Sequence, residues 1–439
     1  MGASLSAFPV TPEANPTRLA PHLAARVGIV GLGYVGLPLA LAYAQAGVAV
    51  VAVDIDERKL GELRAGRSYI DDVSDADLQA VGAGISPTSD YAELADVEAV
   101  VICVPTPLNP NREPDLEPLL ATGRALGGVL RAGQLVVLES TTFPGTTREL
   151  LRPALESSGL RAGEDFNLAF SPERVDPGRS DFNLRNTPKV VGGLTDACAE
   201  RAEQLMRIIC DEVIRVSSPD AAELTKLLEN VFRSVNIALV NELAMLAERM
   251  GIDIWEVIDA ASTKPYGFMR FEPGPGMGGH CLPVDPFYLS WRAREFDAAT
   301  EFVELAGKIN QRMPYHCVEL VQRALNDLGR AVRGARITLL GVSYKGGVSD
   351  TRESPALKIA TLLAELGAEL TFYDPYVESL PQIGPRAETL EDALNDADIA
   401  VIVTTHPGID HAAIAAKVPA LVDLRGATRP DSADNVVLL

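Results

Sequence analysis

A cysteine at the end of a glycine-rich segment is the strongest candidate nucleophile in this sequence. Four glycines occupy positions 274–279, His280 and Cys281 follow them, and Asp285 comes four residues after the cysteine. Glycine backbone can approach a ligand closely, and a thiol presented there can form a covalent adduct with a carbonyl compound. A buried structural cysteine is the alternative, which the surrounding glycines and polar residues disfavour. Whether His280 assists the thiol or is an ordinary loop histidine stays open from the sequence.

A glycine fingerprint near the start of the chain is a second candidate site. The segment Gly31-Leu-Gly-Tyr-Val-Gly36 stands between an apolar run and a helical pattern. In such a turn the first glycine permits tight bending, the second admits a pyrophosphate and the third lets helix and strand pack closely. The N-terminus of the following helix directs unpaired N–H groups at the phosphates. The turn predicts a dinucleotide site formed by Gly31, Gly33, Tyr34, Val35 and Gly36.

Asp54 indicates which dinucleotide binds. It ends the next apolar run, where a carboxylate can accept hydrogen bonds from the adenosine ribose hydroxyls. The same charge would repel a 2′-phosphate, which favours NAD over NADP. FAD-binding domains use similar turns, but nothing else in the sequence indicates a flavin. Pro105 and Thr106 follow a further apolar run, and ligands of parallel sheets bind at such strand ends.

Four polar residues are spaced along one face of a predicted long helix. They are Glu223, Lys226, Asn230 and Arg233. Residues three and four positions apart share a helix face, so one interpretation is an ordinary solvated surface. Beside a thiol and a hydride acceptor, Lys226 can instead stabilise a developing oxyanion, with Asn230 as a second donor.

These candidate residues depend on two α/β regions with a helical region between them. Ser218 and Pro219 are typical of a helix start, and the pattern that they begin continues to about Met250. Helical patterns then extend to roughly residue 328. On both sides, short apolar runs alternate with helical patterns, which predicts parallel strands. The runs lie at 26–30, 48–54, 99–104, 135–138, 168–170, 190–193, 212–216, 335–341, 368–373, 399–404 and 420–424.

Composition bounds the class of protein. The 439 residues are too many for one ordinary core, so two or three domains are expected. A net charge of −21 argues against nucleic acid or an anionic membrane as the main partner. The five cysteines include no CxxC pair, which favours a reducing compartment, here the cytoplasm, over a zinc site or a disulfide framework. No apolar run has the length of a membrane helix, and residues 1–24 lack a secretory pattern.

Several motifs, in order along nearly the whole chain, resemble the nucleotide-sugar dehydrogenase family that includes the UDP-glucose 6-dehydrogenases. Besides the glycine fingerprint and the cysteine segment, they are VPTP at 104–107, STT at 140–142, SPER at 171–174, and the segments 341–345 and 350–355. GHC in place of GSC makes the chain most similar to the UDP-N-acetylglucosamine 6-dehydrogenase branch, and the UDP-N-acetylmannosamine enzymes share that form. UDP-glucose enzymes often carry a second acid where this chain has Pro177.

The resemblance implies an α/β fold with two Rossmann-like parallel-sheet domains joined by a central helical domain that contains one long helix. Residues 1–24 are expected to form a flexible leader, and residues 25–217 an NAD-binding domain. Residues 218–328 then form the central helical and dimerisation domain with the cysteine loop. Residues 329–439 form the UDP-sugar-binding domain. A homodimer or higher homo-oligomer through the central helix is the family expectation.

The reaction that the resemblance implies is a four-electron oxidation of the C6 alcohol of a UDP-sugar, here UDP-N-acetylglucosamine, to the carboxylate. One NAD accepts the first hydride and leaves an aldehyde, to which Cys281 adds as a thiohemiacetal. A second NAD accepts the next hydride, and water hydrolyses the resulting thioester. UDP-N-acetylmannosamine and UDP-glucose are the alternative substrates.

The resemblance also assigns residues to roles. The implied catalytic residues are Cys281, Lys226, Asn230, Asp285, Glu173 and Thr141. Among these, Lys226 and Asn230 stabilise oxyanions, Asp285 and Thr141 organise water and proton transfers, and Glu173 is a candidate base. The cofactor-binding residues beyond the glycine turn are Asp54, Arg58, Pro105, Thr106, Thr142, Lys345 and Arg352. The substrate-binding residues are Glu173, Arg174, Lys226, Asn230, Arg270, Gly278 and Lys345.

Two other classes of function compete with this interpretation. The β-hydroxyacid dehydrogenases also combine a Rossmann domain with a helical region that carries a lysine and an asparagine. Their chemistry needs neither a cysteine nor a second α/β domain, so residues 275–439 disfavour them. A non-catalytic nucleotide-sugar binding protein is disfavoured because the thiol, lysine, asparagine and acid are all present.

Overall fold

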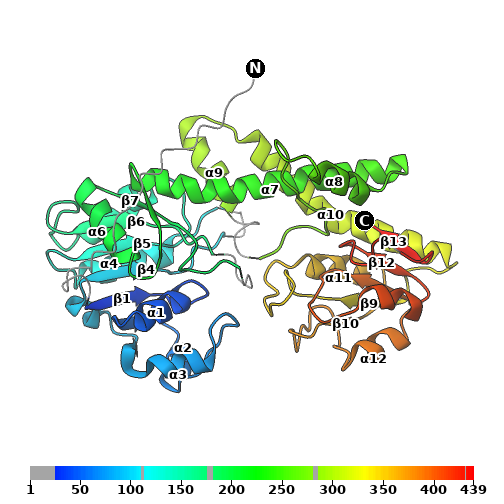
Figure 1. The fold of residues 1–439 in the computed structure, drawn as a ribbon, viewed down its shortest axis with the longest axis horizontal. Coiled ribbons are helices and arrows are strands. Elements are labelled where there is room, and N and C mark those ends of the chain that lie inside the picture. Colours follow the sequence, from blue (N-terminus) through cyan, green and yellow to red (C-terminus); the bar gives the residue numbers. More distant parts are fainter. Residues whose placement is uncertain (1–24, 110–112, 176–180, 280–284, 431) are drawn as a thin grey trace.

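The computed structural model describes residues 25–109, 113–175, 181–279, 285–430 and 432–439. The expected leader, Pro177, His280 and Cys281 lie outside the described residues. Two α/β domains stand side by side, and one long helix, α7 (Pro219–Met250), runs across both (Figure 1). This arrangement confirms the expected fold class, while the expected domain boundaries stay predictions.

The N-terminal domain is built on an eight-stranded sheet in the order β3-β2-β1-β4-β5-β6-β7-β8. Its strands are β1 (Arg26–Val30), β2 (Ala49–Val53), β3 (Ile85–Thr88), β4 (Ala99–Ile102), β5 (Leu135–Leu138), β6 (Asn167–Phe170), β7 (Lys189–Gly193) and β8 (Val213–Val216). Its α-helices are α1 (Gly36–Gln45), α2 (Glu57–Arg64), α3 (Asp75–Val81), α4 (Glu117–Gly127), α5 (Arg152–Glu156) and α6 (Asp196–Met206). One hydrophobic cluster packs α1 and α6 on the sheet, and another packs α4 and α5 on it. Such cover on both faces explains why the strands are near-continuous apolar runs.

The direction of β7 differs from the expectation of an entirely parallel sheet. β6 and β7 pair antiparallel, with Phe170 opposite Gly192, and β8 then pairs parallel to β7. A short apolar run has the same composition in either direction, so the sequence could not predict this reversal. The reversal places the start of β7 at the edge of the sheet where β5 and β6 end.

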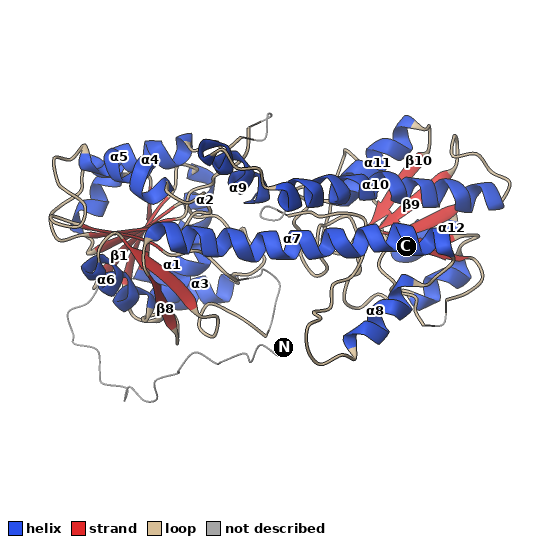
Figure 2. Ribbon diagram, turned by 90° about the horizontal axis from the view of Figure 1, so that it is seen from above, coloured by secondary structure: helices blue, strands red, loops and turns tan. Residues whose placement is uncertain are grey.

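The central region consists of helices. After α7 come α8 (Ile254–Ser262), α9 (Asp285–Ala293) and α10 (Glu301–Asp327), and α10 runs beside α7 (Figure 2). The Ser218 hydroxyl caps α7 by accepting a hydrogen bond from the backbone N–H of Ala221, and Pro219 is the first helical residue. Gly251 ends the helix in the left-handed region, at φ 65°. Within the described part of the chain, no helix combines the length and apolar character that crossing a membrane requires.

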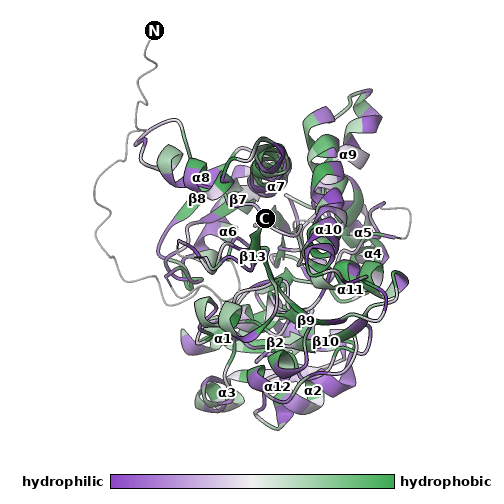
Figure 3. Cartoon of the chain, turned by 90° about the vertical axis from the view of Figure 1, so that its right-hand side faces the viewer, coloured by the Kyte–Doolittle hydropathy of each residue, from purple (hydrophilic) through white to green (hydrophobic). Residues whose placement is uncertain are grey.

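The C-terminal domain repeats the strand-turn-helix pattern around a five-stranded sheet in the order β10-β9-β11-β12-β13. Its elements are β9 (Arg336–Leu340), α11 (Pro355–Glu365), β10 (Glu369–Tyr373), α12 (Leu390–Asn395), β11 (Ile399–Ile402), β12 (Leu421–Asp423) and β13 (Val436–Leu438). All neighbouring strands pair in parallel. In Figure 3, which looks along α7, β9 and β13 have the colour of hydrophobic residues; β9 is mostly buried, whereas β13 is a partly exposed edge strand. Side chains of α10 and α11 complete its core.

Candidate active site

One large cavity lies between the N-terminal domain, α7 and the start of the C-terminal domain. Its volume is about 1360 Å³. The glycine turn after β1, the loops after β2, β4, β5 and β6, one face of α7, and parts of segments 278–285 and 344–352 line it. Segments that are far apart in the sequence therefore meet at one site.

The glycine turn has the conformation that its sequence requires. Gly31 has φ 90°, and a Cβ there would come within 2.7 Å of the backbone that follows β4. No heavy atom lies within 4 Å of the position that a Cβ on Gly33 would occupy. A Cβ on Gly36 would lie 1.8 Å from the Gly31 carbonyl oxygen, so the third glycine serves helix packing and is not among the described cavity-lining residues. Tyr34 and Val35 line the cavity with the first two glycines.

The carboxylate of Asp54 lies at the cavity wall directly after β2. Its Oδ2 accepts hydrogen bonds from the Leu32 backbone N–H at 2.8 Å and from Lys59 Nζ at 3.1 Å. The structure therefore places Lys59, which the sequence interpretation missed, at the position expected for Arg58. The Arg58 side chain is 91% exposed and pairs with Asp56 instead. Arg58 is not among the cavity-lining residues of the described chain although Asp56 is, and its expected cofactor contact stays a prediction.

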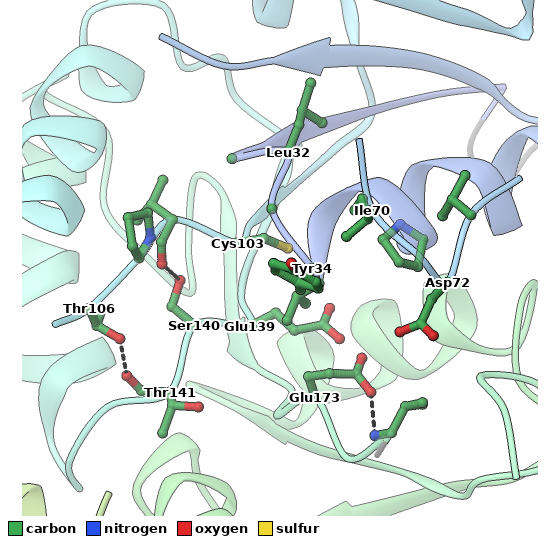
Figure 4. A pocket seen from close by; sticks show the side chains of 18 of the residues that line it. Leu32, Tyr34, Ile70, Asp72, Cys103, Thr106, Glu139, Ser140, Thr141 and Glu173 are labelled. Carbon is green, nitrogen blue, oxygen red and sulfur yellow. Dashed lines mark hydrogen bonds between the residues drawn. The ribbon is translucent and has the colours of Figure 1, made fainter. Parts of the chain in front are cut away.

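The loops after β4 and β5 are tied together at the cavity wall. Thr106 Oγ1 donates to the Thr141 carbonyl oxygen at 2.7 Å, and Ser140 Oγ donates to the backbone after β4 (Figure 4). Pro105, Thr106 and Thr141 line the cavity as expected. Thr142 is buried, is not among the described cavity-lining residues, and its hydroxyl has no hydrogen-bond partner. Its expected cofactor contact stays a prediction.

The polar stripe on α7 is buried over most of its length, so the solvated-face interpretation is wrong for three of its four residues. Lys226 and Asn230 line the cavity at 9% and 6% exposure. Lys226 Nζ donates to the Glu173 carbonyl oxygen at 2.6 Å, and the Asn230 amide donates to Asp285 Oδ2. Burial raises the pKa of Asp285 to about 6, against the opposing effects of the Lys226 charge and the Asn230 hydrogen bond. A lysine, an amide and a carboxyl group whose pKa lies close to neutral pH thus line the same cavity.

Glu223 serves a different purpose from its neighbours on the stripe. Its carboxylate accepts hydrogen bonds from the backbone N–H groups of Gly145 and Thr147, at 2.7 and 2.9 Å, and from the Thr147 hydroxyl. These bonds anchor the first turns of α7 to the N-terminal domain. Lys226 and Asn230 therefore keep a fixed position relative to the glycine turn.

Glu173 lies in a buried charged cluster with Lys189 and Glu139. Lys189 Nζ donates to Glu173 Oε2 at 2.9 Å and also to the Glu139 carboxylate. Burial acts to raise the pKa of Glu173, but the Lys189 charge and the hydrogen bond from the Val175 N–H outweigh it and lower the pKa to about 2. A carboxylate held ionised in this way is a weak proton acceptor. Glu173 lines the cavity, and its expected role as a base stays a prediction.

The segment that leads to Cys281 packs between α7 and the C-terminal domain. The Gly274 backbone N–H donates to Asn241 Oδ1 at 2.9 Å. A Cβ on Gly278 would come within 2.7 Å of Tyr344, and Gly279 has φ 83°. Gly278 lines the cavity as expected. The glycines thus allow close contact with the C-terminal domain.

Two expected cofactor-binding residues of the C-terminal domain differ in their placement. The Arg352 guanidinium lies 4.7 Å from the centre of the Tyr34 ring and lines the cavity. Lys345 is not among the cavity-lining residues of the described chain, whereas its neighbour Tyr344 is. The expected contacts of Lys345 stay predictions.

The expected substrate-binding arginines also separate. Arg174 lines the cavity and forms an ion pair with Glu229 at 2.7 Å. Arg270 pairs with Asp259 at 2.7 Å and with Glu272 at 2.9 Å on an exposed surface. Since these carboxylates hold Arg270 outside the cavity of its own chain, its expected contact is not supported within one subunit.

Sequence reasoning missed the buried cluster formed by Glu139 and Lys189. Both residues are almost fully buried, at 1% and 2% exposure. The sequence did contain a signal, because each of these two charged residues directly adjoins an apolar run. A charged side chain that becomes buried in such a place rarely lacks a partner. The partners could not be identified from sequence, because the reversed β7 brings Lys189 to the ends of β5 and β6.

The turn and its surroundings fit a dinucleotide. The open space at Gly33 leaves room for a pyrophosphate at the start of α1, and Asp54 lies where a ribose would be held. Over the described ranges, no group of three or more His, Cys, Asp or Glu residues could hold a metal ion.

Comparisons with known proteins agree with this geometry along the chain. Residues 25–210 match the NAD-binding domain of the UDP-glucose/GDP-mannose dehydrogenase family, residues 220–312 its central domain and residues 338–430 its UDP-binding domain. The chain is 38% identical over 385 residues to a UDP-N-acetyl-D-mannosamine dehydrogenase of Pyrococcus horikoshii, covering 87% of this chain and 90% of the relative. It is 37% identical to a UDP-N-acetyl-D-glucosamine 6-dehydrogenase of Pseudomonas aeruginosa, with 87% and 88% covered.

A solved structure extends this likeness to three dimensions. The UDP-D-ManNAc dehydrogenase from Pyrococcus horikoshii superposes with a TM-score of 0.86 at 35% identity, covering 94% of this chain and 98% of that one. Fold, site and sequence motifs thus agree. The chain belongs to the UDP-glucose/GDP-mannose dehydrogenase family and is a nucleotide-sugar dehydrogenase with an NAD-binding domain.

Proposed function

We propose that the enzyme oxidises the C6 alcohol of UDP-N-acetylglucosamine to the carboxylate, with NAD as oxidant. The observation that carries this proposal is the convergence of Lys226, Asn230 and Asp285 with the glycine turn around one cavity. A cavity of about 1360 Å³ has room for both a dinucleotide and a nucleotide sugar. In this reaction an alcohol loses two hydrides in succession, and the site must manage charge on oxygen at each step.

Lys226 and Asn230 are suited to stabilise that charge. An ammonium group and an amide N–H, both close to fully buried, act in an environment of low dielectric where they stabilise an oxyanion far more than in water. Asp285 accepts a hydrogen bond from Asn230, and a pKa raised to about 6 suits a group that takes up and releases a proton near neutral pH. Thr141 also lines the cavity and is proposed to orient water for hydrolysis.

Cys281 is the proposed nucleophile, and the residues that precede and follow it support this role. Gly278 and Asp285 bracket the cysteine and both line the cavity. The thiol adds to the aldehyde carbon, the thiol proton leaves to the site and the carbonyl oxygen takes up a proton, which gives a thiohemiacetal with a hydroxyl group. Loss of the hydroxyl proton and of a second hydride leaves a thioester, and water cleaves it to the acid and the free thiol.

NAD is the proposed oxidant, and NAD when bound supplies the hydride acceptor. Gly31, Gly33 and Val35 would receive its pyrophosphate, and Asp54 its adenosine ribose. Lys59 neutralises one oxygen of Asp54 and leaves the other directed at the Asp56 backbone, so the carboxylate is oriented before any ligand arrives.

An N-acetyl sugar is the proposed substrate because both curated relatives described above carry an N-acetylated sugar in their names. UDP-N-acetylmannosamine, named for one of them, is the alternative. Arg174 and Gly278 are proposed to contact the sugar nucleotide, since both lie at the cavity wall nearest α7 and the C-terminal domain.

A homodimer through α7 is also proposed. Seven large apolar side chains of this helix are exposed in the single chain, namely Leu224, Leu228, Phe232, Leu239, Leu243, Leu246 and Met250. Their spacing places all of them on the side opposite Glu223, Lys226 and Asn230. An apolar stripe of this length is typical of a helix that packs on another copy.

Absorbance of NADH with a panel of UDP-sugars tests this proposal. We expect turnover with UDP-N-acetylglucosamine and two NADH per sugar oxidised, and Cys281→Ala should abolish acid formation while NAD still binds. One NADH per sugar would exclude the two-step oxidation. Preference for UDP-N-acetylmannosamine or UDP-glucose would keep the reaction and change the substrate.

A further inference from the structure

The buried cluster of Lys189, Glu139 and Glu173 arises from the reversed strand β7. Because β6 and β7 are antiparallel, Phe170 pairs with Gly192, and continuing this register sets Glu173 opposite Lys189. Glu139 follows β5 at the same edge. Lys189 is 2% exposed and bonds both carboxylates, at 2.9 Å for Glu173 Oε2. One ammonium group therefore joins the ends of three strands beneath the cavity.

Hydrogen bonds extend from this cluster to Lys226. The second oxygen of Glu173, Oε1, accepts from the backbone N–H groups of Arg174 and Val175, at 2.8 and 2.6 Å. The main-chain carbonyl of Glu173 accepts from Lys226 Nζ at 2.6 Å. The conformation of this short segment thus determines where the Lys226 ammonium group points.

We propose that Lys189 is a positioning residue for Lys226. By pairing with Glu139 and Glu173 it fixes segment 171–175, whose Glu173 carbonyl group orients the lysine that faces the substrate. The inference rests on the proposed function, in which Lys226 stabilises an oxyanion. Lys189 itself does not line the cavity within the described chain, whereas both of its carboxylate partners do, and only Glu173 connects it to Lys226 through the hydrogen bonds described above.

The charges of the cluster explain why the arrangement depends on lysine. Removing an ammonium group from between two buried carboxylates leaves negative charge without a partner, which costs more than the loss of one ordinary hydrogen bond. One oxygen of Glu139, Oε2, already has no hydrogen-bond partner. Glu139 can relieve this charge by taking up a proton, whereas Glu173, which lines the cavity, is proposed to turn towards water and so release the Arg174 and Val175 amides.

Lys189→Met tests this proposal through three measurements. Hydrogen exchange at the Arg174 and Val175 amides should accelerate about tenfold or more. Acylation of Lys226, followed by mass spectrometry, should accelerate as its carbonyl partner moves. The kcat should fall at least about tenfold, while the Kd for NAD changes less than about threefold. Unchanged amide exchange or an unchanged kcat would overturn the proposal.

Matched variants separate positioning from general loss of stability. Lys358→Met removes an exposed lysine on α11 and should leave amide exchange and kcat unchanged. Glu139→Gln keeps the ion pair of Lys189 with Glu173. The rate of hydrogen exchange at the amides of residues 174 and 175 should therefore stay within about twofold of the wild-type rate. If Lys189→Met fails to fold, Glu173→Gln must show the same faster exchange and faster Lys226 acylation, and their absence there would overturn the inference.

The outcome also distinguishes this inference from the proposed function. If the wild-type protein produces no NADH with any UDP-sugar, the proposed function is contradicted. Amide hydrogen exchange and acylation of Lys226 would still report on the link from Lys189 to Lys226. An active original protein whose Lys189→Met variant keeps its kcat would contradict only the positioning role.

Discussion

The N-terminal and C-terminal domains begin their sheets with the same local structure. β1 leads into Gly31 at φ 90°, and β9 leads into Gly341 at φ 76°. An aspartate after the second strand accepts a backbone N–H from each turn, at 2.8 Å for Asp54 and 2.7 Å for Asp374. Aligned on these features, the segments read Gly31-Leu-Gly-Tyr-Val-Gly36 and Gly341-Val-Ser-Tyr-Lys-Gly346.

The two turns differ in whether a ligand can reach them. Gly33 faces open space, but its counterpart Ser343 is fully buried and its hydroxyl donates to the Lys345 carbonyl oxygen. Asp54 lines the cavity, whereas Asp374 is fully buried against His406, at 3.0 Å. The comparison teaches that strand order and turn shape alone do not make a dinucleotide site. The two turns differ in whether a ligand can reach the third residue of the turn and the aspartate after the second strand.

The largest effect should come from the glycine at the sixth position of each turn, Gly36 and Gly346, where the two domains are alike. A Cβ would lie 1.8 Å from a carbonyl oxygen at Gly36 and 2.1 Å from one at Gly346. A backbone carbonyl group cannot move out of the way of an added methyl group as a flexible side chain can. Gly36→Ala and Gly346→Ala should therefore each lower the free energy of unfolding by about 3 kcal/mol or more. Urea unfolding measures this, with Gly61→Ala as a control in open space. Normal stability of either variant would show that the turns are not equivalent.

The next prediction concerns the group whose protonation changes kcat, which we expect to lie at the cavity and not inside the C-terminal domain. His406 is sealed in the C-terminal domain, while Asp285 has a pKa raised to about 6 by burial and lines the cavity. Below this pH the carboxyl group is protonated and cannot accept a proton, so kcat should decline. Asp285→Asn should lower kcat by about 100-fold and remove the decline. A decline that persists in the variant would assign the titration elsewhere.

The same pKa has a consequence for stability. Folding raises the pKa of Asp285 above its ordinary value of 3.8, so the folded state binds the proton more tightly than the unfolded state does. The stabilisation from this group is therefore complete below about pH 4 and is lost as the pH rises through about 6. Unfolding of Asp285→Asn should lack this part of the pH dependence.

A smaller effect should follow from exchanging the third residues of the two turns, Gly33 and Ser343. Gly33→Ser adds a side chain where no atom lies within 4 Å, so the fold should persist while the Kd for NAD rises about tenfold. Calorimetry should still find one NAD site per chain in Ser343→Gly, because His406 and Asp374 keep the second turn closed. A second NAD site in that variant would show that the serine alone closes it.

Sequence was sufficient where local chemistry determines structure. Ser218 and Pro219 start α7 and Gly251 ends it, and each acts within a few residues. The glycine turn and Asp54 were predictable for the same reason. The direction of β7 and the contacts of Lys189 were not, because they depend on pairing between residues far apart in the chain. Arg58 and Arg270 lie beside informative motifs, but proximity in sequence does not determine which way a side chain points.

The length of α7 also limits how this enzyme can vary. At about 1.5 Å per residue, the helix separates Glu223, its anchor in the N-terminal domain, from Asn241, which holds the segment before the cysteine, by roughly 27 Å. Inserting one residue between them would rotate the far end by about 100° and swing Asn241 away from Gly274. The number of residues between these two anchors is therefore more tightly constrained than the length of the surface loops.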